Sequence, residues 1–192
     1  MKLVFATNNQ NKVNEVQSLL PEHITILSLK DIACEEDIPE TQPTIEGNAI
    51  QKAQYVKEHY GYDCFADDTG LEVHSLNGEP GVFSARYAGS QRNADDNMNK
   101  LLNELETKEG RSAHFKTVVA LILNGEQHTF TGICNGTIIK EKKGEKGFGY
   151  DPIFMADGFT ETFAQISLAE KNRVGHRGKA VQKLIDFLNT KK

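Results

Sequence analysis

The chain has 192 residues, with 22 Lys and Arg against 27 Asp and Glu, which gives a formal net charge of -5. The hydrophobic share of 38% excludes a disordered chain, and the negative net charge argues against tight binding to a nucleic acid polymer, which needs dense basic patches. Residues 1–96 carry 7 bases and 16 acids, a balance of -9, whereas residues 97–192 carry 15 bases and 11 acids, a balance of +4. This asymmetry indicates that the charges of the two halves have different tasks.

Apolar runs and apolar spacing predict short alternating elements in the first half of the chain. The predicted strands are Lys2–Ala6, Thr25–Ser28 and Asp63–Ala66, and the predicted helices are Lys12–Leu20 and Glu46–Tyr60, with Gly61 as the stop of the second helix. The third strand runs into Asp67-Asp68-Thr69-Gly70, beyond which Leu71–Ser75 continues as a strand and Asn77-Gly78 forms a turn.

The second half predicts a helix, a long hairpin and a final helix. Asn93 is a candidate N-cap for a helix that carries Met98, Leu101, Leu102 and Leu105. Two long strands, His114–Leu123 and Gln127–Ile139, flank the turn Asn124-Gly125. Ser167 begins a capping box, and apolar residues from Ala180 to Leu188 mark the final helix. The order predicts an α/β fold with a mixed central sheet, flanking helices and a long β-hairpin, in one domain over residues 1–192.

Neither a membrane span nor a secretory signal is predicted. The longest wholly apolar run, Val118–Leu123, is far shorter than the roughly 20 residues of a spanning helix, and the N-terminal stretch becomes polar too soon for a signal. Cys34, Cys64 and Cys134 are widely spaced, which favours reduced, buried thiols over disulfides or a zinc site. We therefore expect a cytoplasmic protein that contacts no membrane.

The first candidate site is the polar segment between the first strand and the first helix. It consists of Thr7, Asn8, Asn9, Gln10, Asn11 and Lys12. Backbone N–H groups at a helix start favour anions, and Lys12 adds a positive charge, so the segment is a candidate polyphosphate site. It lacks the glycines of the Walker loop, and a simple helix cap is the alternative interpretation.

The second candidate is the acidic pair in Asp67-Asp68-Thr69-Gly70, which follows the apolar residues Cys64-Phe65-Ala66. Adjacent carboxylates beside a turn repel each other, which makes sense if a divalent cation neutralises them. Mg²⁺ binds one or two carboxylates together with water and substrate phosphates, and a carboxylate can also accept a proton from an attacking water. Glu40 is a candidate further ligand. The alternatives are an Asx-turn at the strand end and, for Glu40, an ordinary surface side chain.

Two further candidates lie in the base-rich half. In Gly147-Phe148-Gly149-Tyr150-Asp151-Pro152 the glycines allow a close approach of the backbone, Phe148 is suited to stack on a nucleobase, and Asp151 is suited to accept hydrogen bonds from ring N–H groups. Lys171 and the pair His176-Arg177 offer donors for acceptor oxygens. A glycine-rich turn with a core Phe, and a solvated helix face, are the respective alternatives.

Taken in order, these segments resemble the inosine/xanthosine triphosphate pyrophosphatase family over essentially the whole chain. The matching residues are Thr7-x-Asn9-x-x-Lys12, Glu40, Asp67-Asp68-Thr69-Gly70-Leu71, Pro80-Gly81-Val82-Phe83-Ser84-Ala85-Arg86-Tyr87, Gly147-Phe148-Gly149-Tyr150-Asp151-Pro152, Lys171 and His176-Arg177. Each motif alone is modest, whereas their order and spacing together are specific.

The resemblance implies Mg²⁺-assisted hydrolysis of inosine, deoxyinosine and xanthosine triphosphates to the monophosphate and pyrophosphate. It also implies a homodimer of elongated, two-lobed subunits with the active cleft between the lobes. The roles that it implies are triphosphate binding by residues 7–12, metal binding by Glu40 and Asp68, proton acceptance from water by Asp68, a substrate contact by Thr69, and base binding by Phe148, Gly149, Tyr150, Asp151, Lys171, His176 and Arg177.

The sequence departs from the family pattern at two positions. Thr69 stands where members commonly have Ser, which keeps the hydroxyl, and Gly175 stands where they commonly have Ser before His-Arg, so we leave Gly175 out of the site. Two other functions compete with the resemblance. A phosphomonoesterase with an aspartyl-phosphate intermediate usually shows Asp-x-Asp-x-Thr, which Asp67 does not begin, and a nucleotide sensor would not need Asp68 as a base.

Overall fold

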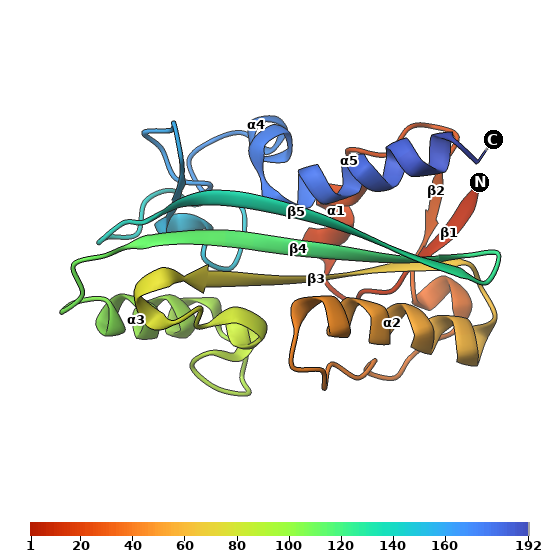
Figure 1. The fold of residues 1–192 in the computed structure, drawn as a ribbon, viewed down its shortest axis with the longest axis horizontal. Coiled ribbons are helices and arrows are strands. Elements are labelled where there is room, and N and C mark those ends of the chain that lie inside the picture. The colour runs from red at the N-terminus through yellow and green to blue at the C-terminus, as the bar shows by residue number, and fades with distance from the viewer. Residues whose placement is uncertain (192) are drawn as a thin grey trace. The chain divides into compact units, whose positions relative to one another are not determined.

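The computed structural model describes residues 1–191 (Figure 1), and the chain divides into two compact units. Unit 1 consists of Met1–Asp68, Thr117–Gly132 and Arg177–Lys192, and unit 2 consists of Thr69–Lys116 and Ile133–His176. Each unit is assembled from segments that are distant in the sequence. The prediction of a single domain over the whole chain stays a prediction.

The helices and strands follow the predicted order. The strands are β1 (Lys2–Phe5), β2 (Thr25–Leu27), β3 (Cys64–Val73), β4 (Ser112–Leu123), β5 (Glu126–Ile138) and β6 (Phe154–Ala156). The α-helices are α1 (Gln10–Gln17), α2 (Ile45–Tyr60), α3 (Ala94–Glu104), α4 (Leu168–Val174) and α5 (His176–Asn189). Short 3-10 segments, among them Gly81–Arg86, were not predicted.

The strands of residues 1–191 form a six-stranded sheet in the order β2-β1-β3-β4-β5-β6. Strand β1 is parallel to both β2 and β3, whereas β5 and β6 are antiparallel, so the sheet is mixed as predicted. Strands β4 and β5 form the predicted hairpin through Asn124 and Gly125, whose φ values of 52° and 84° are those that a two-residue hairpin turn requires.

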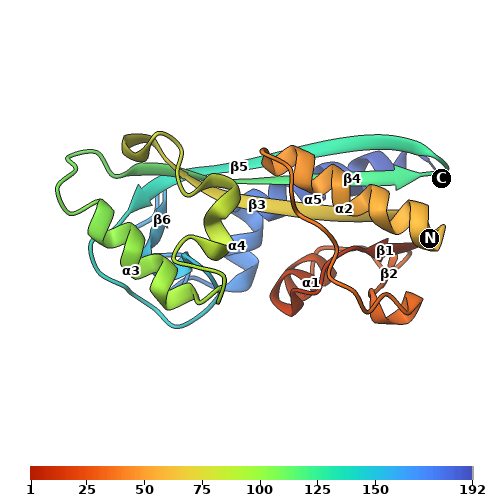
Figure 2. The ribbon, with the colours of Figure 1, turned by 90° about the horizontal axis from the view of Figure 1, so that it is seen from below.

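In unit 1, β3 carries a helix on each face. Cys64 Sγ lies 3.2 Å from the carbonyl oxygen of Ala53 in α2, which places α2 on the Cys64 face of the strand, and Figure 2 shows α2 running along β3. On the other face Phe65 stacks on Phe5 and shares a buried cluster with α1 and α5. That cluster includes Leu3, Val16, Val119, Leu121, Ala180, Val181 and Leu184. Alternate residues of β3 therefore face different helices.

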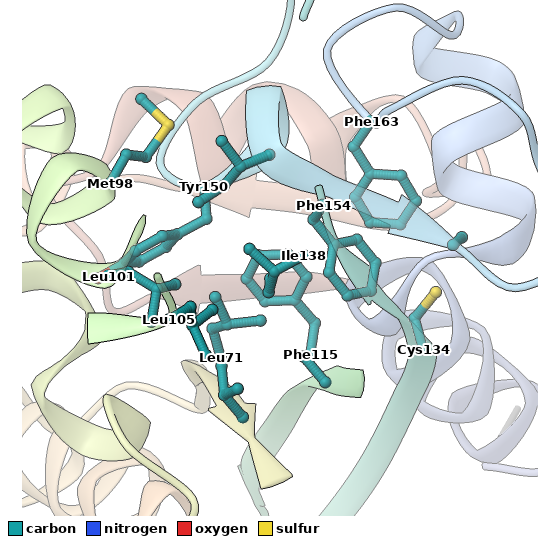
Figure 3. Close-up of a cluster of buried hydrophobic side chains, with 14 of the residues drawn as sticks. Leu71, Met98, Leu101, Leu105, Phe115, Cys134, Ile138, Tyr150, Phe154 and Phe163 are labelled. Atoms are coloured by element: carbon teal, nitrogen blue, oxygen red, sulfur yellow. The ribbon is translucent and has the colours of Figure 1, made fainter. Parts of the chain in front are cut away.

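Unit 2 has its own aromatic core, which Figure 3 shows in close-up. Phe115 contacts Phe154 edge-on, with 4.7 Å between the ring centroids, and Phe163 packs beside both. Leu71, Met98, Leu101, Leu105, Cys134, Ile138 and Tyr150 complete the labelled part of the cluster. Tyr150 belongs both to this core and to the loop 147–151, and so fixes the loop to the core.

Several sequence predictions are confirmed in detail. Asn93 caps α3 by accepting the N–H of Asp96, and Gly61 caps α2. Ser167 and Glu170 form the capping box of α4. All three cysteines are buried and free.

In the described part of the chain, residues 1–191, the structure has no helix that is both long enough and apolar enough to span a membrane.

One prediction about local structure was wrong. The residues Asp67-Asp68-Thr69-Gly70 form no turn at a strand end, since β3 runs unbroken through them from Cys64 to Val73. Polar residues in the middle of a sequence segment usually mark a loop, but here buried cations satisfy the carboxylates and allow the strand to continue. A smaller difference is that α1 starts at Gln10, two residues before the predicted start.

Candidate functional site

The segment Thr7–Lys12 is a capped helix start in unit 1. The side-chain oxygen of Asn9 accepts the N–H groups of Asn11 and Lys12, at 3.0 and 3.3 Å, and the Thr7 hydroxyl oxygen accepts the N–H of Asn9. Asn8 and Gln10 are exposed. Two of the backbone donors that the sequence assigns to a phosphate are thus engaged by the cap. A role in phosphate binding stays a prediction, for which the α1 N-terminus and Lys12 are the structural basis.

The two aspartates of β3 point to opposite faces of the strand. Asp67 follows Phe65 on the face of α1 and α5, whereas Asp68 follows Ala66 on the face of α2, because strand side chains alternate. The sequence argument that one cation neutralises both carboxylates is therefore corrected. Asp67 is neutralised by protein cations, and Asp68 belongs to a different group of charges.

Asp67 lies at the centre of a buried network, which we call the Asp67 network and which consists of Lys12, Glu15, Asp67 and Arg177. Lys12 Nζ lies 2.9 Å from Asp67 Oδ1, and Arg177 Nε donates to Asp67 Oδ2 at 2.9 Å. Arg177 Nη1 donates in turn to Glu15 Oε2 at 2.5 Å. The side chain of Asp67 is 1% exposed and that of Arg177 3%. Two cations and two carboxylates cancel, so the network is electrically neutral.

The pKa values within the Asp67 network follow from burial and its neighbours. Burial raises the pKa of Asp67, but Lys12, Arg177 and Lys52 together lower it further, so the net pKa lies below the ordinary value. Burial lowers the pKa of Arg177, and Asp67 and Glu15 more than reverse this. For Lys12 the balance is the opposite, because burial lowers its pKa more than Asp67 raises it, with a net decrease.

On the other face of β3, Glu40 and Asp68 share one ammonium group. Lys52 Nζ lies 2.5 Å from Glu40 Oε1 and 3.8 Å from Asp68 Oδ1. Burial raises the pKa of Asp68, Lys52 and Lys12 oppose this, and Glu40 and Asp67 add to it, with a net increase. Two carboxylates against one cation leave a surplus of one negative charge in this second group, which we call the Asp68 group.

The donor set of the Asp68 group fits Mg²⁺ held partly by substrate. Its carboxylates supply hard oxygen ligands. The ion pairs of Lys52 with both carboxylates show that they stabilise a positive charge between them. Among residues 1–191, no cluster of three or more His, Cys, Asp or Glu side chains is arranged to hold a metal ion. Two carboxylates with remaining positions for water and phosphate are what Mg²⁺ usually accepts, whereas a metal held by protein alone would need more ligands.

Sequence reasoning missed Lys52 and Glu15, which both carry part of this geometry. Lys52 lies in α2 among the buried residues Ala49, Ala53 and Val56, so a lysine on an otherwise apolar helix face was an available signal. Glu15 stands three residues after Lys12 on α1, on the same helix side, and is similarly buried. Both signals can be used only after the buried face of each helix has been assigned.

In unit 2 the loop 147–151 is folded around the Asp151 carboxylate. Asp151 Oδ2 accepts the N–H of Phe148 at 2.8 Å and lies 2.5 Å from Lys171 Nζ. Gly147 has a φ of 73°, and a Cβ at this position would lie 2.0 Å from the same Asp151 oxygen. Only glycine therefore permits this closeness between the loop and the carboxylate.

The structure brings Lys171, Phe148 and Asp151 together. Tyr150 and His176, which were also predicted to bind the base, are instead buried. Lys171 Nζ lies 4.8 Å from the centroid of the half-buried Phe148 ring, a cation–π distance. Tyr150 is 4% exposed and its hydroxyl donates to the Ser84 carbonyl oxygen at 2.8 Å. The His176 ring stacks on Phe115, with 4.4 Å between centroids.

The remaining predicted residues are Gly149 and Thr69. Gly149 is half-buried in the loop with a φ of 64°, and Thr69 is half-buried in β3 as the first residue of unit 2. Contacts of these residues with a substrate stay predictions. Arg177 is placed by its ion pairs in unit 1, and the loop 147–151 with Lys171 lies in unit 2.

Comparison with known proteins finds relatives that match this chain over nearly its whole length. The chain is 67% identical to a dITP/XTP pyrophosphatase of Flavobacterium johnsoniae over 192 residues, which is 100% of both chains. It is 50% identical to a dITP/XTP pyrophosphatase of Porphyromonas gingivalis over 188 residues, covering 97% of each. The fold, the site and these relatives define a hydrolase of the nucleotide pyrophosphatase class.

The chain belongs to the Ham1 family, whose model matches residues 3–187. Among solved structures, a Ham1 protein of Staphylococcus aureus matches with a TM-score of 0.91 and 38% identity over 100% of both chains. A nucleoside-triphosphatase / dITP/XTP pyrophosphatase of Mycobacterium abscessus matches with a TM-score of 0.78 and 38% identity, covering 96% of this chain and 99% of that one. The family resemblance inferred from the motifs is thereby confirmed.

Proposed function

We propose that this protein hydrolyses inosine, deoxyinosine and xanthosine triphosphates to the monophosphate and pyrophosphate, and so removes deaminated purines from the nucleotide pool. The observation that carries the proposal is the Asp68 group, a largely buried carboxylate and Glu40 held around one ammonium group with surplus negative charge. The names of relatives that match the whole chain support the same reaction.

In the proposed reaction Asp68 accepts a proton from a water molecule, whose oxygen forms a bond to the α-phosphorus. The bond between the α-phosphorus and the bridging oxygen breaks, and pyrophosphate leaves. The raised pKa of Asp68 makes it a stronger base than an ordinary aspartate. Lys12, at the start of α1, stabilises negative charge on the phosphate oxygens.

The chemistry that Mg²⁺ supplies when bound is neutralisation of phosphate charge, with Glu40 and Asp68 as its proposed protein ligands. Because the two side chains offer few ligands, we propose that the metal enters together with the triphosphate. When no metal is bound, the Lys52 ammonium group compensates part of their charge: burial lowers the pKa of Lys52, and Asp68 and Glu40 more than reverse this.

The proposed recognition of the base depends on donors and an aromatic ring. Phe148 stacks on the purine, and Asp151 holds the loop and Lys171 in place for it. Arg177 is the proposed donor for the oxygen at position six, which hypoxanthine and xanthine have and adenine lacks, and Lys171 and His176 are proposed to line the base site. A site built on such hydrogen bonds can discriminate between substrates by up to ~10⁴–10⁵.

The deciding experiment is a panel of purine triphosphates with identification of the first products. We expect inosine, deoxyinosine and xanthosine triphosphates to be hydrolysed to pyrophosphate at much higher kcat/KM than adenosine triphosphate. Orthophosphate as the first product would instead indicate a phosphomonoesterase, and binding without turnover would indicate a nucleotide sensor. Omission of Mg²⁺ from the same assay tests the proposed metal, whose absence should abolish turnover.

We further propose a homodimer that works in the cytoplasm, which the family resemblance supports. Sedimentation equilibrium of the purified protein measures its mass in solution. A monomer across the micromolar range would contradict the dimer.

A further inference from the structure

Glu40 lies in an irregular part of the chain, residues 35–43, which we call the Glu40 segment. These residues all belong to the described part of the chain, most of them are exposed, and none of them lies in a helix or strand. Such a segment lacks the ladder of backbone hydrogen bonds that fixes a residue of β3 such as Asp68. The position of Glu40 therefore depends on contacts with a neighbouring element.

That element is α2, which presents a row of polar side chains to the segment. The four residues of the row stand at positions i, i+3, i+4 and i+7, which lie on one face of a helix: Asn48, Gln51, Lys52 and Tyr55. Taken from the last of them back to the first, their partners in the Glu40 segment follow in increasing order: Glu36, Glu40, Thr41 and Gln42. The segment thus runs antiparallel to α2, and the helix determines its register.

The contact next to Glu40 is a reciprocal pair of hydrogen bonds between Gln51 and Thr41. Gln51 Oε1 accepts the backbone N–H of Thr41 at 2.9 Å, and Gln51 Nε2 donates to the Thr41 hydroxyl oxygen at 2.9 Å. One amide group thereby holds the main chain and the side chain of the same residue. Because the peptide bond between Glu40 and Thr41 is planar and rigid, fixing Thr41 also limits where the Glu40 side chain can begin.

The charges of the Asp68 group make this fixation necessary. Glu40 and Asp68 repel each other, and the single Lys52 ammonium group that contacts both ends a flexible four-carbon chain. Asp68 is held by β3, whereas Glu40 would be free to move away if its segment left α2. A cation that needs both carboxylates is therefore bound more tightly when the main chain at Glu40 is held from elsewhere.

We infer that Gln51 is a positioning residue for metal binding, which holds the Glu40 segment on α2 and so keeps the Glu40 carboxylate beside Asp68. This inference rests on the proposed function, in which these two carboxylates bind Mg²⁺. Gln51 itself touches neither the metal nor the substrate in this proposal. Its loss should therefore weaken metal binding and leave the chemical step unchanged once the metal is saturating.

The first test compares Gln51→Leu, which has a similar size and no hydrogen-bonding group, with the intact protein. The Mg²⁺ concentration that gives half-maximal hydrolysis of inosine triphosphate should rise about tenfold, because two hydrogen bonds are lost, and kcat at saturating Mg²⁺ should hardly change. A merely structural effect would lower kcat and leave the Mg²⁺ midpoint where it is. Gln54→Leu is the matched control, since Gln54 is an exposed residue of α2 that bonds to Gln127, and its midpoint should equal that of the intact protein.

A second variant on the segment keeps the test decisive if Gln51→Leu does not fold. Thr41→Val, at an exposed position, removes the hydroxyl group and retains the backbone N–H, so it should raise the Mg²⁺ midpoint by only about threefold. Added to Gln51→Leu, it should raise the midpoint no further, because the partner of the hydroxyl is already gone. A full additional increase in the double variant would contradict the contact as the cause.

A measurement without turnover separates failure of this inference from failure of the proposed function. Mn²⁺, added to the protein without substrate, should broaden the amide NMR signals of Glu40 and Asp68, and its apparent Kd should be about tenfold weaker in Gln51→Leu and unchanged in Gln54→Leu. A protein that shows this difference but hydrolyses no inosine triphosphate would refute the proposed function and support the positioning. An equal Kd in folded Gln51→Leu, or no broadening at these two residues in the intact protein, would overturn the inference.

Discussion

Asp67 and Asp68 are joined by one peptide bond, yet the protein shifts their pKa values in opposite directions. Three cations outweigh burial at Asp67, whereas burial outweighs the cations at Asp68. A carboxylate with a lowered pKa is suited to permanent ion pairing, and one with a raised pKa is suited to accept a proton. The two residues are thus chemically specialised by the faces that they occupy.

The first prediction at the residue scale is that Asp68→Asn removes turnover while inosine triphosphate still binds. Asparagine has nearly the same shape but cannot accept the proton, so kcat should fall by about 10²–10⁴-fold, the usual contribution of a general base. Steady-state kinetics and calorimetric binding measure the two quantities. Asp37→Asn, at an exposed position, is the control and should leave kcat unchanged. A variant at Asp68 with full activity would refute its assigned role.

At this scale the sequence indicated candidate residues but not the contacts that place them. The identity of Lys12, Asp68 and Arg177 as candidates followed from motif order. Their partners did not, because the contacts of Asp67 with Lys12 and Arg177 join positions 55 and 110 residues apart. Glu15 and Lys52 escaped notice because a single charged residue on a helix usually faces solvent.

At the scale of elements, the loop 147–151 depends on the close approach of the Asp151 carboxylate to the backbone of Gly147. The Asp151 carboxylate fixes both the Phe148 N–H and Lys171, and it lies where a side chain at position 147 would be. By contrast, a Cβ at Gly149 would meet no atom within 4 Å. The two glycines share a positive φ, so substitutions at them differ mainly in this contact.

We therefore predict that Gly147→Ala is more destabilising than Gly149→Ala. Both variants bear the cost of the left-handed conformation, about 1–2 kcal/mol, and only the first also displaces Asp151, which should add about 1–3 kcal/mol for the lost hydrogen bonds. Urea-induced unfolding measures the difference. Equal losses of unfolding free energy would mean that the loop relaxes without disturbing Asp151.

Elements that are determined by residues close in sequence could be predicted. Elements that depend on contacts between distant residues could not. The hairpin at Asn124-Gly125 and the capping box at Ser167 follow from residues close in sequence. The continuity of β3 through Asp67 and Asp68 depends instead on Lys12, Lys52 and Arg177, which no local pattern associates with it.

At the scale of the whole molecule, buried carboxylates should make stability depend on pH. A carboxylate whose folded pKa lies below its unfolded value, about 3.9 for Asp, contributes stability above that value and loses it as the pH falls toward the folded pKa. Asp67 is such a group. Acid therefore removes the negative charge that holds two buried cations together.

We predict that the free energy of unfolding, measured by denaturant titration in the presence of a chelator, falls steeply below about pH 4 in the intact protein. Asp67→Asn should be less stable at pH 7, by about 3–5 kcal/mol, and should depend less on pH below 4. Asp37→Asn, which removes a carboxylate at an exposed position, is the control and should keep the slope of the intact protein. The same slope in Asp67→Asn would show that Asp67 does not carry the acid sensitivity.

The chain crosses between its two units four times, within β3 after Asp68, β4 after Lys116, β5 after Gly132 and α5 after His176. Neither unit is formed by one continuous segment of the chain, so a truncated chain would lose strands that both units use. The tasks of the units consequently cannot be separated by expressing one of them alone. Base selection and phosphate chemistry have to be assigned through single substitutions in the full-length protein.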